Sequence, residues 1–112
     1  MPECIFDQIA SGKIPSEVVY QDETVMAFKD IHPKAPVHVL IIPRKHIASL
    51  ADLKSEDQGT ICHLMESVNI VAQKQGANGN YKVVINTGPA AGQVVMHLHL
   101  HLLAGKKFTS FP

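Results

Sequence analysis

The stretch Val94-Val95-Met96-His97-Leu98-His99-Leu100-His101-Leu102-Leu103 alternates between two kinds of side chain. Because successive side chains of a β-strand point to opposite faces, the alternation predicts a strand over 94–103 with two different faces. One face would be apolar and suited to a core, and the other would carry three histidines about 6.6–7 Å apart at the strand rise. The apolar set is Val94, Met96, Leu98, Leu100 and Leu102, and the histidines are His97, His99 and His101. Such a row indicates a functional site.

The segment directly before this stretch, from Asn86 to Gln93, contains Gly88 and Gly92. Glycines let backbone N–H groups approach a ligand closely, and a series of such groups forms an anion-binding concavity. A glycine-containing loop alone is usually only a turn. Followed at once by a row of imidazoles, it predicts a phosphate held within reach of a histidine.

A row of imidazoles suits either metal binding or nucleophilic catalysis. Zn–N bonds are about 2.0–2.1 Å long, so His97 and His101, roughly 13 Å apart along a strand, cannot easily share one ion. A histidine with an ordinary pKa near ~6.5 is largely neutral at physiological pH, so one can attack phosphorus while another donates a proton. Phosphoryl transfer needs mainly positioning and charge stabilisation, which N–H groups and histidines can supply without a metal.

Length and composition limit the classes of protein to which this chain can belong. A chain of 112 residues with 46% hydrophobic residues is expected to form one domain over 1–112. Ten Lys and Arg balance ten Asp and Glu, so net charge predicts neither a nucleic-acid nor a membrane partner. The start, Met1-Pro2-Glu3, shows no signal segment, and we therefore expect a cytoplasmic protein in which Cys4 and Cys62 form no disulfide framework.

The remaining patterns predict an α+β fold. Helical periodicity covers 4–10 and, after a capping box at 55–58, a longer segment that ends near Gly76. Further strands are expected at 18–20, 24–29, 37–42 and 81–86, the first two forming a hairpin. The strand at 37–42 is apolar enough to be central, and its one polar side chain, His38, would be buried and would need a partner. That partner could be a backbone carbonyl or the histidine row.

The residues Gly92-Gln93-Val94-Val95-Met96 followed by His97-Leu98-His99-Leu100-His101-Leu102 resemble the His-x-His-x-His-x-x signature of the histidine triad superfamily. Further similarities run from Ile5 to Leu103. Segments 35–38, 43–47 and 88–93 are most similar to the histidine triad nucleotide-binding branch. The resemblance implies the histidine triad fold, with a mostly antiparallel five-stranded sheet and one long and one short helix. It also implies a two-fold homodimer, formed through the long helix and the strand at 81–86, with a continuous sheet.

The resemblance also implies a role for each site residue. His99 matches the nucleophile that forms a covalent nucleotidyl intermediate, His101 the residue that contacts phosphate and leaving group, and His97 and His38 the pair that orients the nucleophile. The phosphate-side loop would comprise Asn86, Gly92 and Gln93, with Asp30 on the ribose and Ile5, Phe6, Ile9, Phe28 and Ile31 around the base. Val94 stands where many relatives have Ser or another polar residue.

The implied reaction is hydrolysis of the P–N bond of purine nucleoside 5′-phosphoramidates, which releases AMP and an amine without a cofactor. Aminoacyl-adenylates are the second substrate class that the resemblance implies. A dinucleoside polyphosphate hydrolase is the first alternative. A nucleotide-binding regulatory or scaffold protein with incidental activity is the second, although binding alone would not require the nucleophile.

Some bacterial members of the superfamily have Cys-x-x-Cys at the positions of Cys4 and Asp7 and bind zinc with two histidines. Here an aspartate replaces the second cysteine, so the sequence predicts no metal. The set that a metal would use is Cys4, Asp7, His46 and His97.

Overall fold

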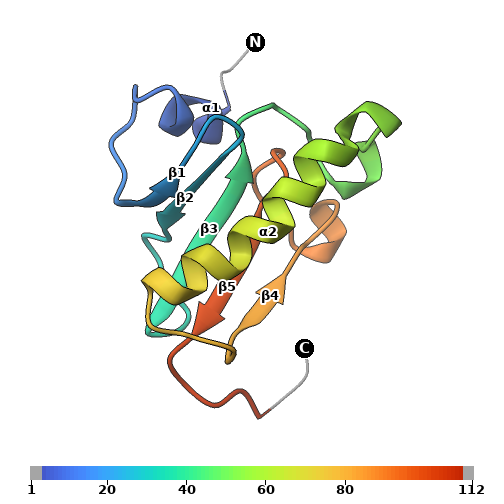
Figure 1. The fold of residues 1–112 in the computed structure, drawn as a ribbon. Coiled ribbons are helices and arrows are strands. Elements are labelled where there is room, and N and C mark those ends of the chain that lie inside the picture. Colours follow the sequence, from blue (N-terminus) through green and yellow to red (C-terminus); the bar gives the residue numbers. More distant parts are fainter. Residues whose placement is uncertain (1–3, 110–112) are drawn as a thin grey trace.

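The protein folds around one five-stranded sheet (Figure 1), which we describe from a computed structural model covering residues 4–109. The strands are β1 (Val18–Gln21), β2 (Val25–Lys29), β3 (Val37–Pro43), β4 (Lys82–Val84) and β5 (Leu100–Ala104). Their order is β1-β2-β3-β5-β4, and every neighbouring pair is antiparallel. The long helix α2 (Gln58–Lys74) crosses one face, and the short helix α1 (Ile5–Ala10) lies near one end of the sheet. The predicted α+β class, the antiparallel sheet and the two helices are confirmed.

The two faces of the sheet bury separate apolar clusters. Alternate residues of β2, β3 and β5 pack against α2: Val25, Ala27, Val39, Ile41, Leu100 and Leu102. The residues between them on β2 and β3 pack against α1 on the opposite face: Met26, Phe28, Leu40 and Ile42, with Phe6 and Ile9 of the helix. Because His38 alternates with Val39 and His101 with Leu102, both histidines lie on the α1 face. The strand period therefore decides which side of the sheet carries the histidines.

The helix α2 begins and ends close to the predicted positions. Its apolar stripe buries Leu64, Val68, Val71 and Ala72 against the sheet, and Gly76, with φ +75°, follows the end of the helix. At the start, Asp57 accepts the backbone N–H of Lys54 at 3.0 Å, one residue earlier than the predicted box at 55–58. Met65 and Ile70 remain 50% and 40% exposed, so part of the apolar stripe is not covered by this sheet.

The prediction of a strand over 94–103 is wrong for its first half. Pairing with β3 ends at Ile41 and Leu100, and residues 94–99 follow an irregular path. One reason is that the N–H of Leu98 donates to the carbonyl of Ile47, in a distant loop of the chain, at 2.7 Å instead of to a neighbouring strand. Val94 and Met96, expected in the core, are 90% and 44% exposed, whereas Leu98, Leu100 and Leu102 are buried.

Smaller differences concern the strand ends and the last residues. β4 covers only Lys82–Val84 of the predicted 81–86, and residues 105–109 form the irregular tail that was expected. The last three residues of that tail lie outside the described part. Within residues 4–109, no helix has the length and apolar character needed to cross a membrane.

Candidate active site

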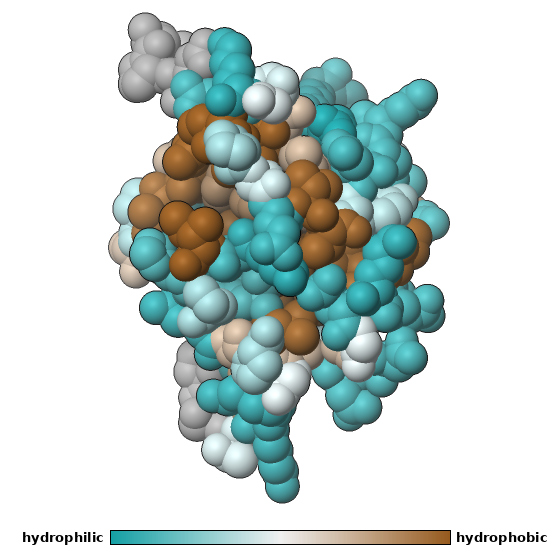
Figure 2. Space-filling model, turned by 90° about the vertical axis from the view of Figure 1, so that its left-hand side faces the viewer, coloured by the Kyte–Doolittle hydropathy of each residue, from teal (hydrophilic) through white to brown (hydrophobic). Residues whose placement is uncertain are grey.

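A cavity of about 660 Å³ opens on the α1 face of the sheet. Apolar side chains gather beside α1 on this side of the molecule (Figure 2). Most of the predicted site residues line the cavity: Ile5, Phe6, Ile9, Phe28, Asp30, Ile31, Asn86, Gly92, Val94, His99 and His101. A mainly apolar cavity with a few convergent polar groups is typical of a small-molecule site.

Hydrogen bonding determines the proton position on His99. Its Nδ1 lies 2.7 Å from the backbone carbonyl of His97, and a carbonyl can only accept, so Nδ1 carries the proton. Nε2 therefore has the lone pair of a nucleophile. The edge contact between the Phe6 and His99 rings, with centroids 5.1 Å apart, packs the imidazole in this orientation.

The same reasoning determines the proton positions on His38 and His101. The backbone N–H of Lys34 donates to Nδ1 of His38 at 3.0 Å, so the proton of a neutral His38 lies on Nε2. That Nε2 is 3.0 Å from Nδ1 of His101, which must then accept. Neutral His101 consequently carries its proton on Nε2, as a hydrogen-bond donor beside His99.

Burial keeps both of these rings neutral. Desolvation, with help from the neighbouring His99 and His38, lowers the pKa of His101 to about 4. Desolvation also lowers the pKa of His38, although the Asp30 carboxylate, 3.4 Å from Nε2, opposes the shift. The His38 and His101 rings are therefore uncharged at neutral pH, and His101 keeps Nε2–H as a hydrogen-bond donor.

Two expectations about supporting residues need correction. His97 and His38 were expected to orient His99 together, but His38 contacts His101, and His97 supports His99 through its backbone carbonyl. Gln93 was expected beside the phosphate, but it does not line the cavity. Its buried amide bonds the N–H of Gly88 and the carbonyls of Ala48 and Val95, so it holds the loop in place.

The glycine-containing loop over 86–93 offers fewer free backbone N–H donors than the sequence predicted. Its centre is a 3-10 turn over Pro89–Ala91, and the N–H groups of Ala91, Gly92 and Gln93 donate to carbonyls inside the loop. These three amides therefore cannot be the expected phosphate cradle. A glycine is still favoured at position 92, because its φ is +98°, a backbone conformation that other residues rarely adopt.

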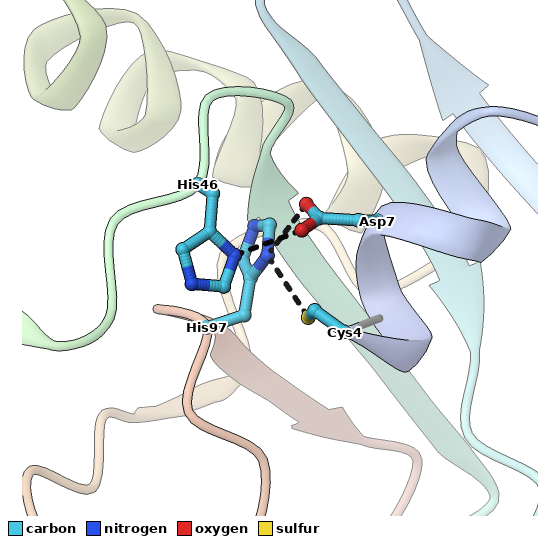
Figure 3. A group of neighbouring side chains, drawn as sticks. All are labelled: Cys4, Asp7, His46 and His97. Atoms are coloured by element: carbon cyan, nitrogen blue, oxygen red, sulfur yellow. Dashed lines mark hydrogen bonds and ion pairs between the residues drawn. The ribbon is translucent and has the colours of Figure 1, made fainter. Parts of the chain in front are cut away.

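The set Cys4, Asp7, His46 and His97 converges on one point (Figure 3), with its ligand atoms all within 4.8 Å of one another. Nε2 of the fully buried His97 donates to the Pro43 carbonyl at 2.8 Å, so Nδ1 has a lone pair facing the cluster. One sulfur, one carboxylate and two imidazoles are ligand types that zinc accepts. The residues therefore fit a zinc ion, which here would cross-link the chain without contacting His99 or His101.

Several residues that line the cavity were not predicted, among them Ile14, Leu40 and Val95. Leu40 could have been predicted to line the cavity, because it lies two residues after His38 and strand alternation places both side chains on one face. Ile14 and Val95 lie in irregular segments, where no periodicity indicates the direction of a side chain.

Known proteins match both the sequence and the geometry. The HIT domain family model matches residues 11–108. A HIT-like protein of Synechococcus elongatus is 45% identical over 93% of this chain and 91% of its own length. The 14 kDa zinc-binding protein of Zea mays is 44% identical over 92% of this chain and 82% of its own. The solved structure of a HIT family hydrolase from Clostridium thermocellum superposes with a TM-score of 0.94, at 41% identity over 99% and 97% of the two chains.

The fold is a five-stranded antiparallel sheet. Its site combines a hydrogen-bonded histidine pair, His38 and His101, with a third histidine, His99, beside an apolar cavity. These features together define the class of protein. The chain belongs to the HIT family, the histidine triad proteins.

Proposed function

We propose that this protein hydrolyses the P–N bond of purine nucleoside 5′-phosphoramidates, and the P–O bond between phosphate and the acyl group of aminoacyl-adenylates, through a covalent intermediate on His99. The observation that carries the proposal is the complementary protonation of two adjacent rings. His99 has its lone pair on Nε2, and His101 has its proton on Nε2, with ring centroids 5.0 Å apart at the cavity. Similarity to a HIT family hydrolase supports a hydrolytic reaction.

The reaction would proceed in two displacements at phosphorus. The Nε2 lone pair of His99 forms a bond to phosphorus as the bond to the amine nitrogen breaks, while His101 donates a hydrogen bond to the phosphoryl group. The departing nitrogen takes a proton from water. The hydroxide equivalent that remains then attacks phosphorus, breaks the bond to His99 and restores its lone pair, which yields AMP.

The cavity favours this substrate over a dinucleoside polyphosphate. A polyphosphate leaving group requires cations to neutralise it. Among the described residues, Lys29 is the one Lys or Arg that lines the cavity, and its Nζ is paired with Glu17 at 2.7 Å. Lys106, in the tail, lines a different cavity near Gly76 and lies over the ring of Phe108.

The test compares kcat/KM for adenosine 5′-phosphoramidate and for diadenosine tri- and tetraphosphate. We expect the phosphoramidate to be turned over at least about tenfold more efficiently, because the site offers a hydrogen-bond donor but few cations. Rapid quenching in denaturant at alkaline pH, where the bond between phosphorus and the imidazole nitrogen survives, followed by peptide mass analysis should locate one adenylyl group on His99. A labelled peptide without His99, or the reverse order of substrates, would overturn the proposal.

We also propose that two copies pair through α2 and β4, as in the nucleotide-binding branch of the family. Met65 and Ile70 leave apolar surface on α2, and β4 is an edge strand of the sheet. Light scattering should report a dimer, and Met65→Glu should shift it toward monomer. A monomeric parent protein would contradict this.

A further inference from the structure

Asp30 connects the cavity to the histidine pair, His38 and His101. The residue lines the cavity, and its backbone N–H donates to the His38 carbonyl at 3.0 Å, which holds it beside β3. The two carboxylate oxygens have different surroundings. Oδ1 accepts the backbone N–H of His32 at 2.8 Å, whereas Oδ2 lies 3.4 Å from Nε2 of His38. Through Oδ2, the carboxylate therefore borders the pair as well as the cavity.

His38 has one ring proton and two acceptors near it. The backbone N–H of Lys34 donates to Nδ1 of His38, so the proton of the neutral ring lies on Nε2. His101 Nδ1 accepts this proton at 3.0 Å, and Asp30 Oδ2, at 3.4 Å, competes for it. An ionised acceptor forms a stronger hydrogen bond than a neutral one. The carboxylate therefore weakens the hydrogen bond between the two rings.

That hydrogen bond decides which nitrogen of neutral His101 carries the proton. While His38 donates to Nδ1, the proton of His101 stays on Nε2, as a donor for a phosphoryl group. One ring nitrogen of His101 lies within 4.8 Å of the carboxylate, and the nitrogen that faces His38 is Nδ1. Burial lowers the pKa of both rings, and the charge of Asp30 opposes the shift in both, so its field reaches each ring. A free carboxylate thus favours the wrong nitrogen, Nδ1, for the proton of His101.

We propose that Asp30 is a positioning residue that couples ribose binding to the proton position on His101. The proposal rests on the proposed function, in which a nucleotide occupies the cavity. Ribose hydroxyls that donate to the carboxylate disperse its charge, so the His38 proton is held by His101 Nδ1 and the His101 proton is held on Nε2. A nucleoside without these hydroxyls leaves the carboxylate free to compete. The enzyme therefore selects ribonucleotides in kcat as well as in binding.

Steady-state kinetics with two substrates tests the coupling. We expect 2′,3′-dideoxyadenosine 5′-phosphoramidate to have about a tenfold lower kcat than adenosine 5′-phosphoramidate, together with a higher KM. Asp30→Asn keeps an oxygen for the His32 N–H but removes the charge, so it should raise KM and give both substrates the same kcat. His38→Ala should also remove the difference in kcat, because the ring that transmits it is gone. Glu23→Gln, at an exposed carboxylate that does not line the cavity, should retain the difference. Equal kcat values for the two substrates in the parent protein would overturn the proposal.

NMR of the ¹⁵N-labelled histidine rings tests the same coupling without turnover. In the absence of ligand, Asp30→Asn should raise the fraction of His101 that is protonated on Nε2. Adenosine, which has no phosphate to accept that proton, should raise this fraction in the parent protein at saturation, whereas 2′,3′-dideoxyadenosine should not. If neither nucleoside binds, the proposed function fails, while the ligand-free comparison still decides whether Asp30 acts on the pair. The same fraction in the parent protein and in Asp30→Asn would contradict the coupling.

Discussion

The Nδ1 atom of His99 donates a 2.7 Å hydrogen bond to the backbone carbonyl of His97. Because a carbonyl never donates, this one bond assigns the lone pair of His99 to Nε2. His97 therefore orients the His99 ring through its main chain, and its side chain remains available to the cluster with Cys4 and Asp7.

If His99 is the nucleophile, His99→Ala should reduce phosphoramidate turnover at least about a thousandfold, because no other group can form the covalent intermediate. Binding of AMP should change little, since ribose and base contacts come from other residues. Steady-state kinetics and calorimetry measure the two effects. His63→Gln, a substitution outside the cavity, is the control, and turnover above a few per cent of the parent rate would exclude His99 from this role.

We expect His38 to affect the rate of the reaction only through its hydrogen bond to His101. Removing its Nε2–H leaves His101 free to change tautomer, and the loss of one hydrogen bond, ~1.4 kcal/mol, corresponds to about a tenfold lower kcat for His38→Ala. In a His101→Ala background the same substitution should have no further effect. If the fold-losses in kcat of the two single variants multiply in the double variant, His38 acts on the reaction independently of His101.

Asp30 should bind the ribose hydroxyls. It lines the cavity, and although Oδ1 already accepts the N–H of His32 at 2.8 Å, a carboxylate can accept several hydrogen bonds. Loss of a charged acceptor costs ~1.5–3 kcal/mol, so Asp30→Ala should weaken AMP binding by roughly one to two orders of magnitude. A dideoxy analogue should lose far less affinity. Equal losses would show that Asp30 only shapes the loop at 30–36.

The ion pair between His63 and Asp22, 2.6 Å apart, should make stability depend on pH. The hydrogen bond to Asp22 raises the pKa of His63. A raised pKa contributes stability that is fully present below the unfolded-state pKa of about 6.5 and is lost as pH rises through the folded-state value. Urea unfolding should therefore show His63→Gln less stable than the parent at pH 5.5 and nearly equal at pH 9. A difference that grows with pH would contradict this assignment.

His101 should show the opposite pH dependence. Its pKa is lowered to about 4 by burial, so its contribution to stability is present above about pH 6.5 and is lost as pH falls toward 4. The unfolding free energies of the parent and His101→Gln, measured at pH 7 and pH 4.5, should converge at the lower pH. A constant difference between the two proteins would indicate that His101 titrates normally in the folded state.

The sequence by itself determined the elements of the sheet and the chemistry that they carry. Alternation in the second half of 94–103 assigned His101 to the face opposite the apolar stripe, and the apolar run at 37–42 predicted a central strand with a buried His38. The 3.6-residue periodicity of 58–74 located α2. Both succeed because apolar burial against a sheet imposes a fixed period on local sequence. The same rule was wrong at Val94 and Met96, where alternation continues although strand pairing has ended.

Only the tertiary structure decided which groups meet. The register that pairs Leu40 with His101 brings His38 Nε2 to His101 Nδ1, and a backbone amide at Lys34 then sets the position of every proton in that pair. Cys4, His46 and His97 come together from three segments of the chain, each positioned by contacts that no local pattern records. Distances of 3 Å between residues far apart in sequence depend on strand register and loop path, and the packing of the whole chain fixes both.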